Sequence, residues 1–215
     1  MASQKTSLRK LISNRDEDLL LDRSTELKLF KQAFDGGEIN SENMLKALGQ
    51  FMALLVSSNS KFDKYRRNES GGTMTADELD GYAIFNQKCA SCHATDLFTD
   101  NSFRNNGLAI NPLVNDIGRF RVTQLESDKY KFKVPSLRNI EKTAPYMHDG
   151  RFYTLEAVLD HYSSGVVNTQ NLDESLNNNG TLGIPLTQTE KAKIIAFLKT
   201  LTDNEFLTNP KFAEY

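Results

Sequence analysis

Apolar side chains recur at helical spacing in two segments of the first third of the chain. From Ser24, apolar residues lie three and four positions apart until the Asp-Gly-Gly at 35–37, which predicts one helix. The Asn-Ser at 40–41 suits the start of a second helix, whose broad apolar face we expect in the core. The apolar positions are Leu27, Phe30, Ala33 and Phe34, then Met44, Leu45, Ala47, Leu48, Phe51, Met52, Leu55 and Val56.

Three further helices are predicted by their start signals. Residues 75–78 and 187–190 both read Thr-x-x-Glu, the pattern of a capping box. Thr154 is a candidate cap for a helix over 155–162, and Gly165 suits its end. The helix that starts at the first capping box runs directly into the two cysteines of the chain.

Cys89 and Cys92 are these cysteines, and His93 follows at once. The spacing Cys-x-x-Cys-His is typical of c-type haem attachment. Each thiol forms a thioether with one haem vinyl group, and the adjacent imidazole is placed to bind iron. We therefore predict Cys89 and Cys92 as covalent anchors and His93 as the proximal iron ligand.

Three alternatives to haem attachment were considered for the same residues. A zinc site needs four ligands, and His148 and His161 are the only other histidines. A redox-active cysteine pair belongs in a βαβ unit, and no such alternation is visible in the sequence. A structural disulfide between residues so close in sequence rarely has good geometry, and it gives no reason for the histidine.

The helix before the cysteine motif and the helix after 187–190 together resemble the cytochrome c fold, in which two such helices cross closely. Gly81 and Phe85 against Phe197 would fit that crossing. Long loops at 100–117 and 133–151 are expected to wrap the haem. The predicted fold class is therefore all-α, a cytochrome c-like haem domain preceded by a helical segment.

Composition excludes some classes of partner. Lys and Arg number 26 and Asp and Glu 28, a net charge of −2, which argues against nucleic acid. No apolar run approaches the roughly 18 residues that a membrane span needs. The basic start at residues 1–10 is followed by no apolar stretch, so we predict no signal peptide in this chain. Residues 1–22 are polar and charged and are expected to be a loosely attached arm or the remnant of a missing upstream segment.

Longer segments resemble the bacterial di-haem cytochrome c peroxidases and their MauG-like relatives over about residues 26–202. The most specific segment is TAPYMHDG at 143–150. The other matching segments are LFKQAF at 29–34, EIN at 38–40, LVSSNSKFD at 55–63, FRNNGL at 103–108, DIGR at 116–119 and FKVPSLRN at 132–139.

The resemblance also shows departures from the family. Family members carry two haem motifs, and this chain has one. The first haem of the family meets peroxide beside a Glu-Met pair, which nothing before Leu27 supplies, and the tryptophan between the haems is missing. We therefore expect residues 1–70 to be a remnant of, or linker from, a first haem domain, and residues 71–215 to be the electron-transferring haem domain.

The resemblance implies further site residues. Phe85, Pro135, Leu137, Arg138 and His148 are expected to line the cofactor, with the Arg138 guanidinium near a haem propionate. By the same resemblance, backbone oxygens of Thr143 and Pro145 would contribute to a calcium site, and we expect calcium to bind weakly or not at all.

The sixth iron ligand has four candidates: Met147, His148, His161 and Tyr162. Thioether sulfur is a common ligand in cytochromes c, which favours Met147. In the family the ligand lies fourteen positions after the histidine of Tyr-x-His-Asp-Gly, which here is Tyr162, and MauG-like members carry a tyrosine there. We predict Tyr162, with Met147 as the alternative.

The predicted function is electron transfer through one covalent haem c to a peroxide-reducing site. The alternative is a MauG-like enzyme that oxidises a substrate with peroxide, active by itself or as a fragment of a larger enzyme. The resemblance implies a small redox protein as donor, a cytochrome c or a cupredoxin, and hydrogen peroxide as substrate of the full-length enzyme. It also implies a periplasmic location and leaves a homodimer open. For this chain alone we expect poor peroxidase activity.

Overall fold

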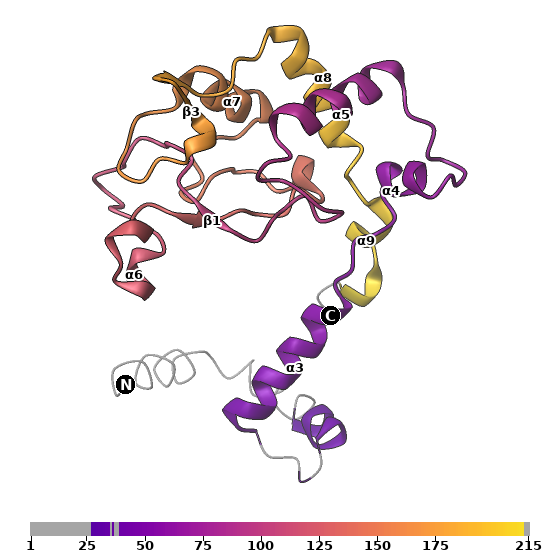
Figure 1. Cartoon of the computed structure of the whole chain (residues 1–215). Helices are drawn as coiled ribbons and strands as arrows, with labels where there is room; N and C mark the ends of the chain where they lie inside the picture. Colours follow the sequence, from indigo (N-terminus) through magenta and orange to yellow (C-terminus); the bar gives the residue numbers. More distant parts are fainter. Residues whose placement is uncertain (1–26, 35, 37–38, 213–215) are drawn as a thin grey trace. The chain divides into compact units, whose positions relative to one another are not determined.

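The computed structural model describes residues 27–34, 36 and 39–212, so the predicted polar arm at 1–22 lies outside the described residues. The chain divides into two compact units, Met1–Val56 and Ser57–Tyr215 (Figure 1). Among the described residues, no helix is long and apolar enough to cross a membrane.

The first unit holds the two helices predicted from apolar spacing. Residues 27–33 are helical, and helix α3 spans Ser41–Leu54. The Asn40 side chain caps α3 by accepting a hydrogen bond from the Asn43 amide, 2.9 Å away. No residue of α3 is buried, so the expectation that its apolar face lies in the core is wrong for the described part of the chain. Met44, Leu45, Leu48, Phe51 and Met52 are all exposed.

The second unit is rich in helices, as predicted, and also contains two small pairs of strands that the sequence did not reveal. Its α-helices are α4 (Lys61–Arg66), α5 (Ala76–Lys88), α6 (Phe120–Thr123), α7 (Leu155–Asp160), α8 (Gln188–Lys199) and α9 (Asn204–Leu207). A π-helix, η3 (His161–Gly165), follows α7. Single 3₁₀ turns are η1 (Glu126–Asp128), η2 (Ile140–Lys142), η4 (Glu174–Leu176) and η5 (Pro210–Phe212).

Both strand pairs are antiparallel and consist of two-residue strands. Strand β1 (Phe103–Arg104) pairs with β2 (Phe132–Lys133), with Phe103 opposite Lys133. Strand β3 (Asn177–Asn178) pairs with β4 (Thr181–Leu182). These strands are too short to show an alternating pattern, which explains why the sequence did not predict them.

The predicted helix starts are confirmed. The Thr75 and Thr187 side chains accept from the amides of Glu78 and Glu190, and each glutamate carboxylate accepts from the amide of its threonine. Thr154 caps α7 in a simpler way, by accepting from the Ala157 amide. Each cap satisfies backbone donors that a helix start would otherwise leave unpaired.

Helices α5 and α8 cross in close contact, and they lie side by side in Figure 1. A Cβ on Gly81 would meet the Lys193 carbonyl and would come within 3.0 Å of the Phe197 Cβ, so only glycine fits here. The ring centroids of Phe85 and Phe197 are 5.1 Å apart. The crossing predicted from Gly81, Phe85 and Phe197 is therefore present.

Phe197 is the centre of the core and is 0% exposed. Edge-to-face contacts join it to Phe62 at 5.3 Å and to Phe98 at 5.9 Å between ring centroids. Such aromatic pairs contribute about 0.5–1.5 kcal/mol each beyond the area they bury. Because Phe62 belongs to α4, this helix packs within the second unit, and the structural division falls before the boundary predicted at residue 70.

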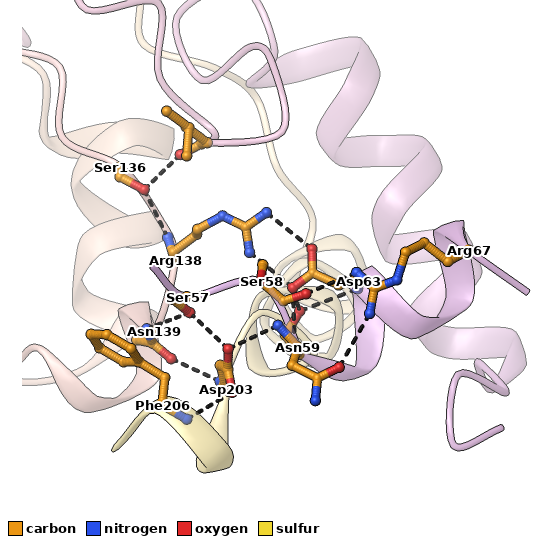
Figure 2. A network of polar contacts seen from close by, with 12 residues as sticks. Ser57, Ser58, Asn59, Asp63, Arg67, Ser136, Arg138, Asn139, Asp203 and Phe206 are labelled. Atoms are coloured by element: carbon orange, nitrogen blue, oxygen red, sulfur yellow. Dashed lines mark hydrogen bonds and ion pairs between the residues drawn. The ribbon is translucent and has the colours of Figure 1, made fainter. Parts of the chain in front are cut away.

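A buried polar network fastens the start of the second unit to its C-terminal part (Figure 2). The Asp203 carboxylate accepts from Ser57 Oγ at 3.2 Å and from the Asn59 amide at 2.8 Å. Asn139 joins the two sides, because its Oδ1 accepts from the Asp203 amide at 2.8 Å and its Nδ2 donates to Ser57 Oγ at 3.0 Å. The network thus links three segments that are distant in the sequence.

Candidate functional site

The cysteine motif begins where α5 ends. Cys89 is the C-cap residue of α5, and its amide donates to the Phe85 carbonyl at 2.8 Å. The His93 amide then donates to the Cys89 carbonyl at 3.0 Å, so the motif continues in a tight turn. Both thiols are free, so the disulfide alternative is not observed. Burial raises the pKa of the Cys89 thiol to about 12, with a smaller contribution from Cys92.

His93 is oriented by the backbone of two loops. Its Nδ1 lies 2.9 Å from the Phe98 carbonyl oxygen. Burial lowers the pKa of His93, and backbone hydrogen bonding to Phe98 and to Pro135 opposes this effect. A neutral imidazole that donates from Nδ1 to a carbonyl keeps Nε2 as its lone-pair nitrogen, which is the arrangement that metal-binding histidines adopt. Two free thiols and this imidazole fit a covalent haem.

Arg104 fixes the loop that contains the cysteines, a role that the sequence did not reveal. Its guanidinium pairs with Asp100 at 2.7 Å and with Asp173 at 3.0 Å, and it donates to the Ser91 carbonyl at 3.3 Å. The pKa of the Arg104 guanidinium is raised above its usual value, and the hydrogen bond to Asp100 is the main cause. Arg104 thus connects the residues between the two cysteines to the segment after η3.

Tyr162 lies in the π-helix η3, and its assignment as an iron ligand stays a prediction. Burial raises the pKa of the Tyr162 phenol, a hydrogen bond with the Asn106 side chain lowers it, and the nearby thiols of Cys92 and Cys89 raise it. The Tyr162 carbonyl accepts from the Ile184 amide at 2.7 Å, which holds the π-turn in place. π-Turns are frequent at functional sites.

Met147 and His161 both contact Asn106. The Asn106 Nδ2 donates to Met147 Sδ at 3.2 Å, and Met147 has a left-handed backbone with φ of 73°. His161 is buried, and its Nε2 lies 3.0 Å from the Asn106 carbonyl oxygen. Burial is the main cause that lowers the pKa of His161, and hydrogen bonding to Asn106 and Gly165 opposes it. Two of the four candidate ligands therefore contact the same asparagine.

His148, the fourth candidate, has a different environment. Its ring is stacked on Phe132, with centroids 3.8 Å apart and the two planes 8° from parallel. It lines a small hollow together with Asn105, Asn106, Asp116 and Tyr130. Its assignment to the cofactor pocket stays a prediction.

Arg138 has a buried partner in the protein. Its Nη1 and Nη2 donate to the two carboxylate oxygens of Asp63, each at 2.9 Å (Figure 2). The side chains of Arg138 and Asp63 are only 12% and 9% exposed. Its Nε is buried and has no hydrogen-bond partner among the described residues, and the contact of Arg138 with a propionate stays a prediction.

The remaining predicted residues fall into two groups. Phe85 is part of the aromatic core, and Leu137 is partly buried against it. Thr143 and Pro145 are exposed in the turn after η2, and their role as calcium ligands stays a prediction. In the part of the chain that the structure describes, no three His, Cys, Asp or Glu side chains gather in a way that could hold a metal ion.

The fold and the site define a helix-rich protein whose paired thiols and oriented imidazole suit covalent haem. A family model described as di-haem cytochrome c peroxidase matches residues 14–71. The chain is 36% identical over 197 residues to methylamine utilization protein MauG of Methylorubrum extorquens, covering 87% of this chain and 53% of that protein. It is 35% identical over 182 residues to cytochrome c551 peroxidase of Nitrosomonas europaea, covering 82% of this chain and 49% of that protein.

Solved structures agree with these sequence comparisons. A MauG-like protein associated with microbial copper homeostasis has a TM-score of 0.67 at 30% identity, covering 85% of this chain and 64% of that one. The diheme peroxidase BthA from Burkholderia thailandensis has a TM-score of 0.64 at 22% identity, covering 87% of this chain and 59% of that one. The chain belongs to the di-haem cytochrome c peroxidase and MauG-like family. It spans about half the length of the curated relatives it matches.

Proposed function

We propose that this chain is a cytochrome c-like electron-transfer module with one covalent haem c. In this proposal Cys89 and Cys92 form the thioether links, and His93 Nε2 is the proximal ligand. Haem bound in this way supplies a one-electron iron couple. In the complete enzyme, the module passes electrons to a peroxide-reducing site.

The observation that carries this proposal is the contact of 2.9 Å between His93 Nδ1 and the Phe98 carbonyl oxygen. This contact restrains the ring orientation and leaves Nε2 as the nitrogen proposed to bind iron. A hydrogen bond at Nδ1 also raises the basicity of the ligand nitrogen. The same loop places Phe98 in the aromatic core, so the orientation of His93 is coupled to the packing of that core.

Tyr162 is our proposed sixth ligand, with Met147 as the alternative. The support is that Tyr162 is close enough to both cysteine thiols for their charges to affect its pKa. Phenolate is a hard anionic donor, so it stabilises ferric iron and lowers the reduction potential. His161 is a poorer candidate, because its Nε2 is engaged by the Asn106 carbonyl.

A second candidate function is peroxide-dependent oxidation of another substrate. It is favoured by the 36% identity to a methylamine utilization protein MauG. The two candidates differ in iron chemistry, because an open coordination position favours reaction with peroxide and two protein ligands favour electron transfer.

Partners and location complete the proposal. A small cytochrome c or cupredoxin is the proposed electron donor, hydrogen peroxide is the proposed substrate of the complete enzyme, and the periplasm is the proposed compartment. Two further proposals rest on the family resemblance alone. One is a calcium site at Thr143 and Pro145, and the other is a homodimer.

The test is production of the chain in a host that attaches haem c, followed by acid–acetone extraction. The proposal expects the colour to stay with the polypeptide, and to be absent from the double variant Cys89→Ala, Cys92→Ala. Colour that leaves with the solvent, or zinc bound in stoichiometric amount, would contradict it.

A further inference from the structure

Arg104 of β1 joins the loop that contains the cysteines to two other segments of the second unit. Its Nη2 donates to the Ser91 carbonyl at 3.3 Å and to the Asp100 carboxylate at 2.7 Å, and its Nη1 donates to the Asp173 carboxylate at 3.0 Å. Its Nε donates to Ser102 Oγ at 2.8 Å. Each nitrogen of the guanidinium is therefore engaged, and one of its contacts lies on the backbone between the two cysteines.

The two carboxylates of this cluster are held in place by hydrogen bonds of their own. Asp100 Oδ1 accepts from the amide and the hydroxyl of Ser102, and the Asp100 amide donates to the Cys92 carbonyl at 3.0 Å. Asp173 Oδ1 accepts from the amide and the hydroxyl of Ser175. These hydrogen bonds are independent of the guanidinium, so both carboxylates keep partners that hold them at the cysteine loop.

The cluster places three charges next to the predicted haem attachment. Arg104 supplies one positive charge and the carboxylates of Asp100 and Asp173 supply two negative ones, on side chains that are only 29%, 22% and 16% exposed. Reduction of haem iron adds an electron, so nearby negative charge opposes reduction and lowers the potential. Partial burial leaves such charges less screened by salt. The charges also act on the predicted iron ligand, because burial lowers the pKa of His93 most, Asp100 raises it and Arg104 lowers it.

We propose that Arg104 raises the reduction potential of the haem by compensating the Asp100 and Asp173 carboxylates at the loop between the two thioether links. This proposal rests on the covalent haem of the proposed function. It goes beyond that function because it assigns control of the potential to a side chain outside the predicted iron ligands.

The first test measures the reduction potential of the haem-loaded protein and of its Arg104→Gln variant by spectroelectrochemical titration at low ionic strength. Glutamine keeps a polar side chain and removes the positive charge, so two carboxylates remain uncompensated. We expect the potential of Arg104→Gln to be lower than that of the unchanged protein. Arg104→Lys keeps the charge, so its potential should lie close to the unchanged value. Equal potentials in all three proteins would overturn the proposal.

A charge-matched double variant separates the effect of charge from that of loop geometry. Arg104→Gln, Asp173→Asn lacks the guanidinium but has the same net charge as the unchanged cluster. The asparagine oxygen can still accept from Ser175, as the carboxylate does. We expect the potential to return toward the unchanged value. A potential as low as that of Arg104→Gln would mean that loss of loop geometry causes the shift, and the proposal would be wrong.

Arg119→Gln is the matched control. Arg119 pairs with Asp128 at 3.0 Å, and its guanidinium lies 4.1 Å from the ring centroid of Phe103, the neighbour of Arg104 in β1. The substitution makes the same change in charge at a side chain that is 38% exposed and whose partners lie outside the cysteine loop. We expect its potential to be that of the unchanged protein. An equal fall in Arg119→Gln and Arg104→Gln would contradict a role of the cluster itself.

Asp173→Asn alone provides a test that does not depend on how well the Arg104 variants fold. It leaves the guanidinium bonded to Asp100 and to the Ser91 carbonyl and removes one negative charge, so the potential should rise. An unchanged or lower potential would overturn the proposal. A haem stain made beforehand separates the two levels. An unchanged protein without covalent haem contradicts the proposed function and this inference together, whereas haem-loaded variants without shifts in potential contradict this inference alone.

Discussion

Gly81 of α5 lies against Phe197 of α8, and a Cβ at Gly81 would come within 3.0 Å of the Phe197 Cβ and closer still to the Lys193 carbonyl oxygen. Because the closer contact is to backbone, the helices would have to move apart. Overpacking of a tight core typically costs about 1–3 kcal/mol. We therefore expect Gly81→Ala to lower the free energy of unfolding by about 2 kcal/mol, measured by denaturant titration of the haem-loaded protein.

Gly49 in α3 offers a matched control. It also lies inside a helix, but a Cβ there would meet no atom within 4 Å. Alanine is favoured over glycine in a helix by about 1 kcal/mol, so Gly49→Ala should not destabilise the chain. Equal losses in the two variants would show that the close contact at Gly81 is unimportant.

The buried pair of Asp63 and Arg138 predicts a strong effect of a single substitution. Removing one member of a buried ion pair leaves the other charge without a partner, which costs about 3–5 kcal/mol. We expect this loss for Arg138→Met and a smaller loss for the double variant Asp63→Leu, Arg138→Met. Glu205→Gln, which breaks the solvent-exposed pair with Lys64, should leave the free energy of unfolding nearly unchanged, because water screens such a pair. A double variant as unstable as Arg138→Met would contradict this account.

The same carboxylate predicts a pH dependence. Burial acts to raise the pKa of Asp63, but hydrogen bonds from Arg138 and Ser60 outweigh it and hold the pKa below its usual value. A lowered pKa in the folded state means that the contribution to stability is complete above about pH 4, the unfolded value. It is then lost as the pH falls through the folded value. Asp63→Asn should therefore reduce the loss of stability at low pH. Urea titration of both proteins at several pH values measures this difference.

Local signals in the sequence were sufficient for much of the fold. The capping boxes at Thr75 and Thr187 correctly predicted where α5 and α8 begin, because a cap depends on contacts within a few residues. The crossing of the two helices at Gly81 and Phe197 was predicted from the resemblance to the cytochrome c fold.

Contacts between distant residues were not predictable in this way. Arg138 bonds to Asp63, 75 positions away, and nothing in the local pattern around either residue indicates the other. Asn106 was visible only as part of a matching segment, because its contacts are with Met147 and His161, which are distant in the sequence. The apolar face of α3 has the spacing of a core helix, and spacing alone does not say which element covers a face.

The chain by itself should reduce hydrogen peroxide slowly. It holds one Cys-x-x-Cys-His motif, and the resemblance assigns reaction with peroxide to a different haem. A steady-state assay with reduced small cytochrome c as donor measures this directly, with an intact two-haem relative as reference. Turnover as fast as that of the relative would mean that one haem is sufficient.

The most direct test of the account is the intact mass of the chain after production with the haem c attachment machinery. We expect the mass of the polypeptide plus one haem, since Cys89 and Cys92 form the single attachment motif. The variant Cys89→Ala, Cys92→Ala should have the mass of the polypeptide alone. A polypeptide mass without haem for the unchanged protein, under conditions in which a known c-type cytochrome is loaded, would contradict the central claim.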